Sequence, residues 1–266
     1  MSSGSRTVRW RVLGRRSVLS CDSELVVRSA DSTDPTRRTD SSGSGAFDGR
    51  FDHAPGLIIN QQHRREETPH EGGRWPISIM LTPAPDSLVA NAVERLMLEA
   101  MQYAGPGHWP TGRIGTSHLT VRALEHRRES IPADDPGVRQ YRAALRRACA
   151  RCRPVTFRVT GLTLTPSTVM AVAVPTDEQA DRLLDLVADA LPDGPETAIG
   201  RRDIWYLNLM HFAADIADPC GLVDWVADRR GLEIGTVTID RCRLVRWHFD
   251  PVQFMRPVPL AEYPLA

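Results

Sequence analysis

The chain contains no lysine, so its 33 basic residues are all arginine. This absence excludes mechanisms that need a lysine amine: a Schiff base to pyridoxal phosphate, the lysyl-adenylate of a ligase, a P-loop lysine and the strand lysine of a protein kinase. Arginine can still bind phosphate or carboxylate through its planar set of donors. Several enzyme classes are therefore excluded, while recognition of an anionic substrate stays open.

Net charge is also lacking, because 33 acidic residues balance the 33 arginines. No global field would draw the chain to nucleic acid or to an anionic membrane, so an RNA partner would need a local basic patch. No run of eighteen apolar residues occurs, and we expect no membrane span. A content of 41% hydrophobic residues in a chain of 266 is that of a globular domain with a core.

Cysteine is sparse, with five scattered residues in a chain that has no apolar secretory segment. This pattern predicts reduced thiols and a cytoplasmic protein. Cys149 and Cys152 have the CxxC spacing, but no second pair or nearby histidine supplies further ligands. Ordinary helical cysteines are favoured over a zinc site, and no other metal-binding pattern occurs. We therefore expect neither a metal nor an organic cofactor.

Residues 1–72 mix Ser, Arg, Asp, Gly and Thr with only short apolar patches. Such a composition predicts a largely disordered extension, with a regulatory tail or a start codon placed too early as alternatives. From residue 73 onward the sequence shows regular apolar patterns. Residues 73–266 have the patterns of a single two-lobed domain.

The first half of this domain follows the order strand, helix, strand. Alternating apolar residues predict a strand at 75–81, and Asp86 can cap a helix that Gly105 ends. A second strand is expected at 117–123. A connecting helix over 136–152 leads to the second half.

The second half repeats this order. Strands are predicted at 155–164 and 169–174, and residues 176–179 form a capping-box signature for the helix that follows. The next predicted strand, 204–210, lies 88 positions after its counterpart in the first half. The chain is therefore expected to hold a two-fold internal repeat.

The chain closes with a helix capped by Asp218 and β-rich segments near 236–239 and 242–249. Together these elements predict an α+β fold. We expect two antiparallel sheets that face a central cleft, with the helices packed outside.

The strand at 117–123 carries the best chemical candidates. Successive residues of a strand point to opposite faces, so His118, Thr120 and Arg122 should share one face while Leu119 and Val121 point into the core. This spacing offers an imidazole for proton transfer and, two residues on, a hydroxyl for an anionic oxygen. A hydrogen-bonded, half-buried histidine without chemistry is the plain alternative.

The run Ser117-His118-Leu119-Thr120-Val121, in the first of two similar halves, resembles the H-x-T/S signature of the 2H phosphoesterase superfamily, also called the LigT or 2′-5′ RNA ligase-like family. The resemblance covers the order of elements over roughly residues 75–260. It implies one such motif in each half, with two histidines facing each other across a cleft. It further implies that these act as general base and general acid on a 2′,3′-cyclic phosphate or a 2′-5′ linkage, while two hydroxyls hold the phosphate without a metal.

The second motif departs from that pattern. Aligning the halves puts Tyr206 where the second His belongs and Asn208 where the second Thr or Ser belongs. Tyr206 can donate a proton but is a poor base at neutral pH, and Asn208 offers an amide to an oxyanion. His211 would point to the other face of a regular strand, although a β-bulge could turn it inward. Tyr206 could equally be an amphipathic core residue.

Other residues could bind the substrate. Arg122 or the pair Arg201–Arg202 could neutralise an anion, with solvated surface arginines as the alternative. The loop 105–112 is dense in Gly and Pro and could form a lid. Its Trp109 would then stack on a flat group such as a base, unless it closes the edge of the core.

Three functions are consistent with these residues. The first is a metal-independent phosphodiesterase that acts on a cyclic or 2′-5′ phosphodiester of a nucleotide or small molecule, with His118 and either Tyr206 or His211 sharing the proton transfers. The second is a repurposed lyase, isomerase or cyclase with His118 as base and Tyr206 or Asn208 polarising a carbonyl. The third is a non-catalytic binder of nucleotide or RNA. A monomer is favoured.

Overall fold

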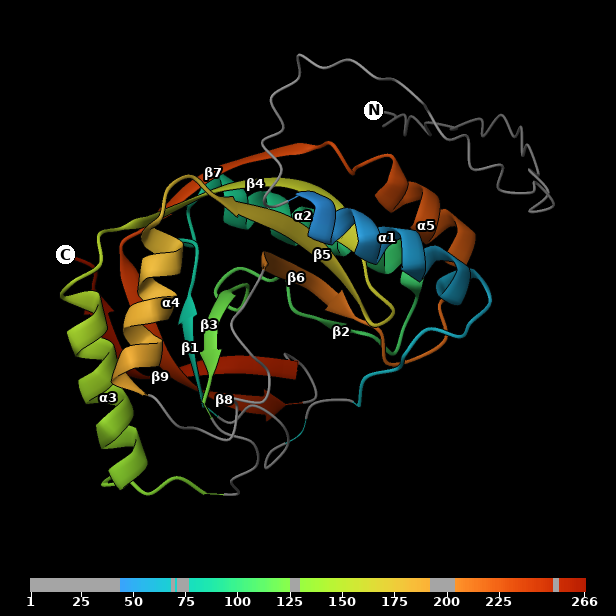
Figure 1. Cartoon of the computed structure of the whole chain (residues 1–266). Coiled ribbons are helices and arrows are strands. Elements are labelled where there is room, and N and C mark those ends of the chain that lie inside the picture. Colours follow the sequence, from blue (N-terminus) through green and yellow to red (C-terminus); the bar gives the residue numbers. More distant parts are fainter. Residues whose placement is uncertain (1–43, 68–69, 71–76, 125–129, 192–203, 251–253) are drawn as a thin grey trace, which may run out of the picture. The chain divides into compact units, whose positions relative to one another are not determined.

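The computed structural model describes residues 44–67, 70, 77–124, 130–191, 204–250 and 254–266. Within these residues the chain forms five helices and nine strands (Figure 1). The helices are α1 (Ser44–Ile59), α2 (Leu88–Ala104), α3 (Pro136–Cys149), α4 (Gln179–Ala190) and α5 (Pro219–Ala227).

The strands form two antiparallel sheets. In spatial order the four-stranded sheet holds β3 (Leu119–Ala123), β1 (Ile77–Leu81), β8 (Arg241–Asp250) and β9 (Phe254–Pro264). The five-stranded sheet holds β2 (Trp109–Pro110), β6 (Trp205–His211), β5 (Thr168–Pro175), β4 (Val155–Leu164) and β7 (Glu233–Ile239). The predicted α+β class with two antiparallel sheets is confirmed.

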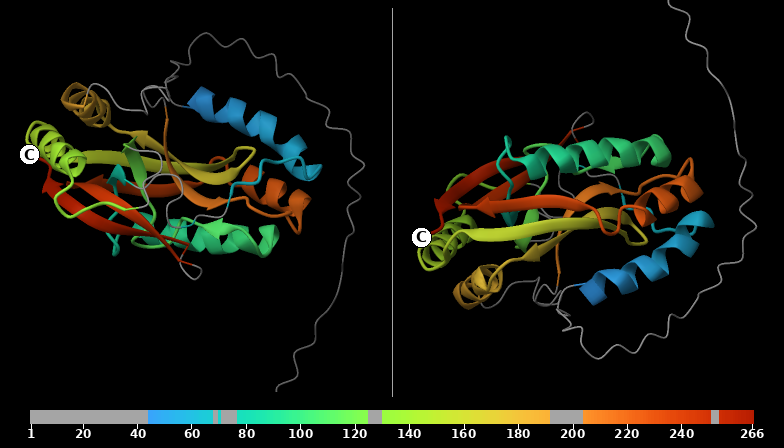
Figure 2. Two further views of the ribbon diagram at one scale, coloured as in Figure 1. Left: turned by 90° about the horizontal axis from the view of Figure 1, so that it is seen from below. Right: turned by 90° about the horizontal axis from the view of Figure 1, so that it is seen from above.

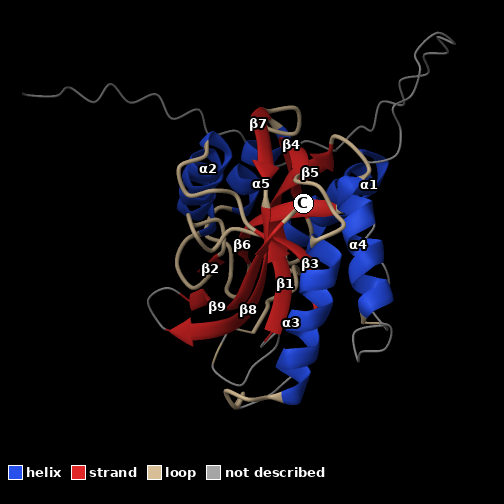
Figure 3. Ribbon diagram, turned by 90° about the vertical axis from the view of Figure 1, so that its left-hand side faces the viewer, coloured by secondary structure: helices blue, strands red, loops and turns tan. Residues whose placement is uncertain are grey.

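The helices pack against the sheets from several sides. Helix α2 packs on β6 and β7, while α3 packs on β8 and β9. Helices α3 and α4 lie side by side (Figure 3). Helices α1 and α2 lie on opposite sides of the strands (Figure 2). The two faces of the five-stranded sheet are therefore covered by different helices.

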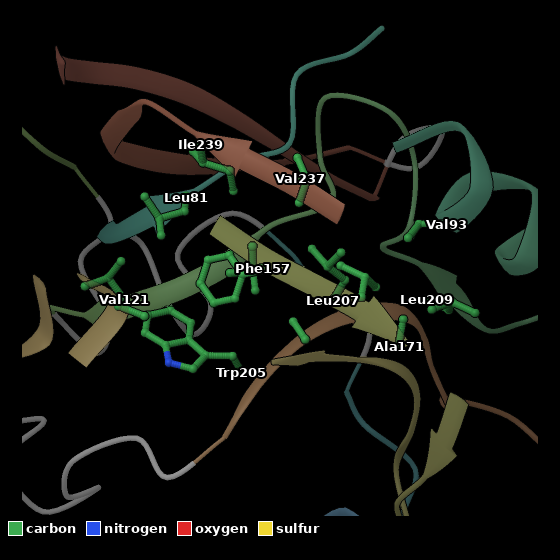
Figure 4. Close-up of a cluster of buried hydrophobic side chains, with 14 of the residues drawn as sticks. Leu81, Val93, Val121, Phe157, Ala171, Trp205, Leu207, Leu209, Val237 and Ile239 are labelled. Atoms are coloured by element: carbon green, nitrogen blue, oxygen red, sulfur yellow. The ribbon is translucent and has the colours of Figure 1, made fainter. Parts of the chain in front are cut away.

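One apolar core joins the two sheets. Leu81 and Val121 from the four-stranded sheet lie in the same buried cluster as Phe157 and Leu207 from the five-stranded sheet, together with Val93 of α2 (Figure 4). All five side chains are at most 3% exposed. Burial of these side chains, at about 1.5–3 kcal/mol for each large one, holds the sheets together.

The internal repeat is visible in the strand register. The units β1-α2-β3 and β5-α4-β6 have the same element order, as the sequence predicts. A β-bulge interrupts β3 at Val121, where Ile79–Met80 of β1 face Arg122 and Thr120. The corresponding bulge in β6 is at Leu209, 88 positions later. The two halves thus share a local irregularity as well as their order of elements.

Two predicted helix starts are wrong in detail. Helix α2 is capped by Ser87, whose hydroxyl accepts a hydrogen bond from Ala90 N, one residue after the expected Asp86. The capping box at 176–179 does not form, because Glu178 makes no side-chain cap bond and Gln179 is buried and accepts a bond from Arg153 N. The cap at Asp218 is confirmed by its bond from Gly221 N.

Strand β9 is absent from the prediction because three prolines punctuate it: Pro257, Pro259 and Pro264. Proline cannot donate to a strand ladder, so a run of this kind does not look like a strand in isolation. The topology explains why it is tolerated. Strand β9 lies at the edge of its sheet and pairs on one side only, with β8.

Helix α1 lies inside the stretch that the sequence predicts to be disordered. Its sequence contains Pro55 and three glycines, which weaken any helical signal. Packing provides the missing stability, because Ala54 and Ile58 are fully buried in the core and Phe47 is 4% exposed. The expectation of disorder is therefore wrong for residues 44–67, and residues 1–43 lie outside the described part of the chain.

The segment after α1 is bonded to the loop that follows β6. The side-chain amide of Gln61 donates to Ile216 O and accepts from Ile216 N. Glu66 N donates to Phe212 O at 2.6 Å, and the His63 imidazole donates from Nε2 to Ala214 O at 3.0 Å. These bonds join residues 61–66 to the segment next to His211. Among the described helices, none is long and apolar enough to cross a membrane.

The buried side chains of α1 should make the helix necessary for stability. Replacing Ile58 with Ala removes a fully buried side chain and should lower the free energy of unfolding by about 2–5 kcal/mol in urea titrations. The matched change Leu98→Ala, at a position 54% exposed on α2, should stay within about 0.5 kcal/mol of wild type. Equal unfolding midpoints for the two variants would contradict the packing of α1.

Candidate functional site

The first candidate strand places His118 and Thr120 on one face. Thr120 pairs with Met80 of β1, and both His118 and Thr120 are half-buried. The Nδ1 atom of His118 lies 2.8 Å from Thr116 O. A carbonyl oxygen can only accept, so Nδ1 carries the proton and the lone pair of the neutral ring is on Nε2. In this tautomer Nε2 is free of a proton and can act as a general base.

The bulge at Val121 corrects the predicted position of Arg122. In a regular strand Arg122 would share a face with Thr120, but the extra residue pairs Arg122 with Ile79, on the opposite face from Met80. Its guanidinium donates from Nη1 to Leu191 O at 2.6 Å, beyond the last turn of α4. Arg122 is therefore held by the end of a helix, away from the face of Thr120.

The second candidate strand brings three polar residues to one face. Tyr206, Asn208 and His211 pair with Val172, Met170 and Thr168, which alternate along β5 and so share a face. The bulge at Leu209 is what places His211 on this face, because a regular strand would turn it away.

His211 is held by two neighbours. Its Nε2 lies 3.1 Å from Nδ2 of Asn208, and its ring stacks on Trp109 with centroids 4.1 Å apart and planes 13° from parallel. His211 is 8% exposed and Trp109 is 3% exposed. Of the two predicted roles for Trp109, this geometry fits closing the edge of the core, since one face of its ring lies against His211.

A small aromatic cluster links the two candidate strands. Met80, Trp109 and Trp247 are buried together in it. The ring of His118 lies against Trp247 with centroids 4.7 Å apart, and the ring of His211 lies against Trp109. Strands β3 and β6 also contact each other. His118 of the first motif and His211, which follows the second motif, therefore border one shared apolar cluster.

Helix α1 packs on the same face as the second motif. Thr163 of β4 pairs with Met170, which pairs with Asn208, so the three side chains share a face. The hydroxyl of Thr163 donates to Phe47 O of α1 at 3.2 Å. The segment expected to be disordered thus covers part of the face that carries Asn208.

One basic residue on the site face escaped the sequence interpretation. Arg243 of β8 pairs with Met80, as Thr120 does from the other side, so Thr120 and Arg243 share a face. Its Nε donates to Glu262 at 2.5 Å. The sequence pattern could have indicated Arg243, because it occupies every second position with Val245 and Trp247 in the predicted strand and so shares their face. The predicted pair Arg201–Arg202 lies outside the described residues.

The loop before β2 is packed rather than open. His108 is 2% exposed, donates from Nε2 to Ala104 O at 3.1 Å and accepts at Nδ1 from Ala213 N at 3.2 Å. Gly105 and Gly107 have φ of 82° and 90°, and a Cβ on either would lie 2.8 Å from an alanine Cβ of the 213–217 segment. These contacts seat the predicted lid segment against the chain that follows β6.

The CxxC pair is buried at the end of α3 and just after it. Burial raises the pKa of the Cys152 thiol to about 11, which favours the protonated form. Within the described residues no group of three or more His, Cys, Asp or Glu side chains is arranged to hold a metal ion.

No protein-family model matches the sequence, and no curated protein matches it. Among solved structures, E. coli LigT complexed with 3′-AMP has a TM-score of 0.50 at 14% identity, covering 73% of this chain and 99% of that chain. The protein TT0787 of Thermus thermophilus has 18% identity and a TM-score of 0.48, covering 71% of this chain and 97% of that chain. The chain thus has the fold of LigT, and the resemblance first seen in the His118 strand is confirmed at the level of the fold.

Burial of His108 should make stability depend on pH. Desolvation is the main cause that lowers the pKa of His108 from its ordinary value of 6.5. The unfolded chain therefore binds the proton more tightly than the folded chain, so stability is complete above about pH 6.5 and falls as the pH drops toward the folded pKa. Urea midpoints measured from about pH 7.5 to pH 5 should show this decline.

The variant His108→Gln provides the control, because its amide can accept from Ala213 N and donate to Ala104 O without titrating. The decline should be shallower in this variant than in wild type. A decline of equal slope in both proteins would show that His108 does not cause it.

Proposed function

We propose that the chain is a phosphodiesterase that hydrolyses a 2′,3′-cyclic or 2′-5′ phosphodiester of a nucleotide or a related small molecule. The observation that carries the proposal is that β3 and β6, the equivalent strands of the two halves, contact each other. Each strand presents a polar motif ahead of an equivalent bulge. His118 of the first motif lies against Trp247, and Asn208 of the second is bonded to His211, whose ring stacks on Trp109 of the same cluster. The fold shared with LigT supports it, and that protein was crystallised with 3′-AMP.

His118 is the general base in this proposal. The bond from Nδ1 to Thr116 O orients the ring and leaves the lone pair on Nε2. Nε2 takes a proton from water as the water oxygen forms a bond to phosphorus. Such a proton transfer contributes about 10²–10⁴-fold to the rate.

Tyr206 is the general acid, because it occupies the position in β6 that His118 occupies relative to β3. A phenol hydroxyl is a hydrogen-bond donor and can give its proton to the departing ester oxygen. The bond from phosphorus to that oxygen breaks, one water is consumed, and a phosphomonoester and a hydroxyl result. The proton on His118 then returns to Tyr206 through solvent.

Thr120 and Asn208 hold the phosphate oxygens. The hydroxyl of Thr120 and the amide of Asn208 lie two residues after His118 and Tyr206, on the same faces as those residues. Donors placed in advance stabilise the charge that develops on the oxygens in the transition state. The proposed groups perform both proton transfers, so turnover should continue in the presence of a chelator.

A second candidate function is favoured by the chemistry of the second motif. His211 is 8% exposed and bonded to Asn208, which leaves His118 as the more accessible imidazole of the two. A lyase, isomerase or cyclase needs one base and a group that polarises a carbonyl, and His118 with Tyr206 or Asn208 would provide these. The substrate would then carry no phosphodiester.

Removal of His118 tests the proposed base. Purified protein in EDTA should open a 2′,3′-cyclic nucleotide, and His118→Ala should lower kcat/KM by about 10²–10⁴-fold. The control His53→Ala removes an exposed imidazole from α1 and should leave the rate unchanged. If wild type turns over no cyclic or 2′-5′ substrate, the phosphodiesterase is excluded. A metabolite bound by wild type but not by His118→Ala would then support the second candidate.

Substrates with different leaving groups test whether Tyr206 acts as the general acid. Tyr206→Phe should slow hydrolysis of a cyclic nucleotide by roughly 10²-fold, because the departing ribose oxygen needs a proton. A p-nitrophenyl ester of a nucleotide has a leaving group that departs without one, so this substrate should react at close to the wild-type rate. Equal losses on both substrates would mean that Tyr206 does not act as the acid.

A further inference from the structure

We propose that His211 is a positioning residue that fixes the side-chain amide of Asn208 for binding an anionic oxygen. The inference rests on the proposed function, since it assigns a partner to one of the phosphate-binding groups. The side-chain amide of asparagine, like that of glutamine, has two possible orientations. An amide can turn by 180° and present its carbonyl oxygen in place of its nitrogen, and only the nitrogen can donate to an anion.

The contact with His211 distinguishes these two orientations. Nδ2 of Asn208 lies 3.1 Å from Nε2 of His211, so Nδ2 donates and Nε2 accepts. While the imidazole proton is on Nδ1, the reversed amide would set Oδ1 against the lone pair of Nε2, and two acceptors repel. With the proton on Nε2, the ring would instead bond the reversed amide through Oδ1. Within the described residues Asn208 makes no other side-chain hydrogen bond, and its Oδ1 is buried without a partner. The bond to His211, with Nε2 as the acceptor, is therefore the one that holds Asn208 with Nδ2 toward the ring.

An amide nitrogen carries two hydrogens. One is bound to His211 in this arrangement, and the second is the donor that remains for an oxygen of the substrate. The arrangement requires that the imidazole proton of neutral His211 be on Nδ1, because Nε2 must accept. The tautomer of His211 and the orientation of Asn208 are thus coupled.

The imidazole itself is held in place from the neighbouring strand. Trp109 of β2 pairs with His211 and stacks on its ring at 4.1 Å. Residues Thr111 and Gly112 both donate from their backbone N–H groups to Leu209 O, at the bulge itself. Strand β2 and the two residues that follow it therefore fix both the bulge and the ring that the bulge turns toward Asn208.

The other half of the repeat shows what happens without an asparagine. Thr120 stands at the position of Asn208, and Ala123 stands at the position of His211, each 88 residues earlier. A hydroxyl rotates freely and can donate or accept, so it needs no partner to select an orientation. The second half has the amide of Asn208 together with the imidazole of His211. The first half has the hydroxyl of Thr120 together with Ala123, which has no polar side chain.

Two variants separate the hydrogen bond from the packing. His211→Phe keeps an aromatic ring against Trp109 but removes the acceptor, and it should raise the Kd for 3′-AMP by about ten-fold or more in calorimetry. His211→Gln has a carbonyl oxygen that can accept from Nδ2, and it should recover part of the lost affinity, because its amide nitrogen can also donate to Oδ1 of the reversed Asn208. The double variant Asn208→Ala with His211→Phe should bind no worse than Asn208→Ala alone, because both changes remove one interaction.

A matched control comes from another buried imidazole. His63 is 2% exposed, contacts Phe212 edge-on and donates to Ala214 O outside the two motifs. His63→Phe also replaces an imidazole by a phenyl ring and should leave the affinity for 3′-AMP unchanged. An affinity of His211→Phe equal to wild type, or equal losses in both phenylalanine variants, would overturn the proposal.

Nitrogen-15 NMR tests the geometry without any ligand. The proposal requires the neutral ring of His211 to carry its proton on Nδ1, and it requires the Asn208 amide signals to shift in His211→Phe. A proton on Nε2, or unchanged Asn208 signals, would overturn the inference. If wild type neither binds 3′-AMP nor turns over a phosphodiester, the proposed function fails while these NMR results still decide whether His211 orients Asn208.

Discussion

The arrangement of the candidate site depends on one constraint, the β-bulge that each half of the repeat places after its motif. A bulge adds one residue to one strand of a pair and so exchanges the faces of all residues beyond it. At Val121 it turns Arg122 toward Leu191 O and away from Thr120. At Leu209 it brings His211 onto the face of Asn208. The same irregularity therefore removes a cation from one motif and adds an imidazole to the other.

The second motif differs from the first in chemistry although its backbone register is equivalent. Tyr206 and Asn208 occupy positions equivalent to His118 and Thr120, but Asn208 lies in contact with a histidine that has no counterpart in the first half. The two halves are thus related in backbone and different in chemistry. One half offers an imidazole and a hydroxyl, and the other a phenol and an amide held by a buried imidazole.

Residues 44–66 are packed and hydrogen-bonded against the strands and loop next to the site. Helix α1 packs on the face that carries Asn208, and residues 61–66 are bonded to the loop that follows His211. The sequence could not indicate this, because Pro55 and the glycines of α1 conceal a helix that depends on burial of Ala54 and Ile58. Strand β9 was concealed in the same way, by prolines that only an edge position tolerates.

The sequence by itself determined the fold class, the two-fold repeat and the strands around His118 and Tyr206, because apolar periodicity and helix caps are local properties of the chain. It also placed His118 and Thr120 on one face, since no bulge lies between them. Only the tertiary structure decided the faces of Arg122 and His211, the stacking of Trp109 and the docking of α1. Each of these depends on which residues of a neighbouring strand or helix provide the partners, and a register between segments far apart in sequence is not written in the pattern of either one.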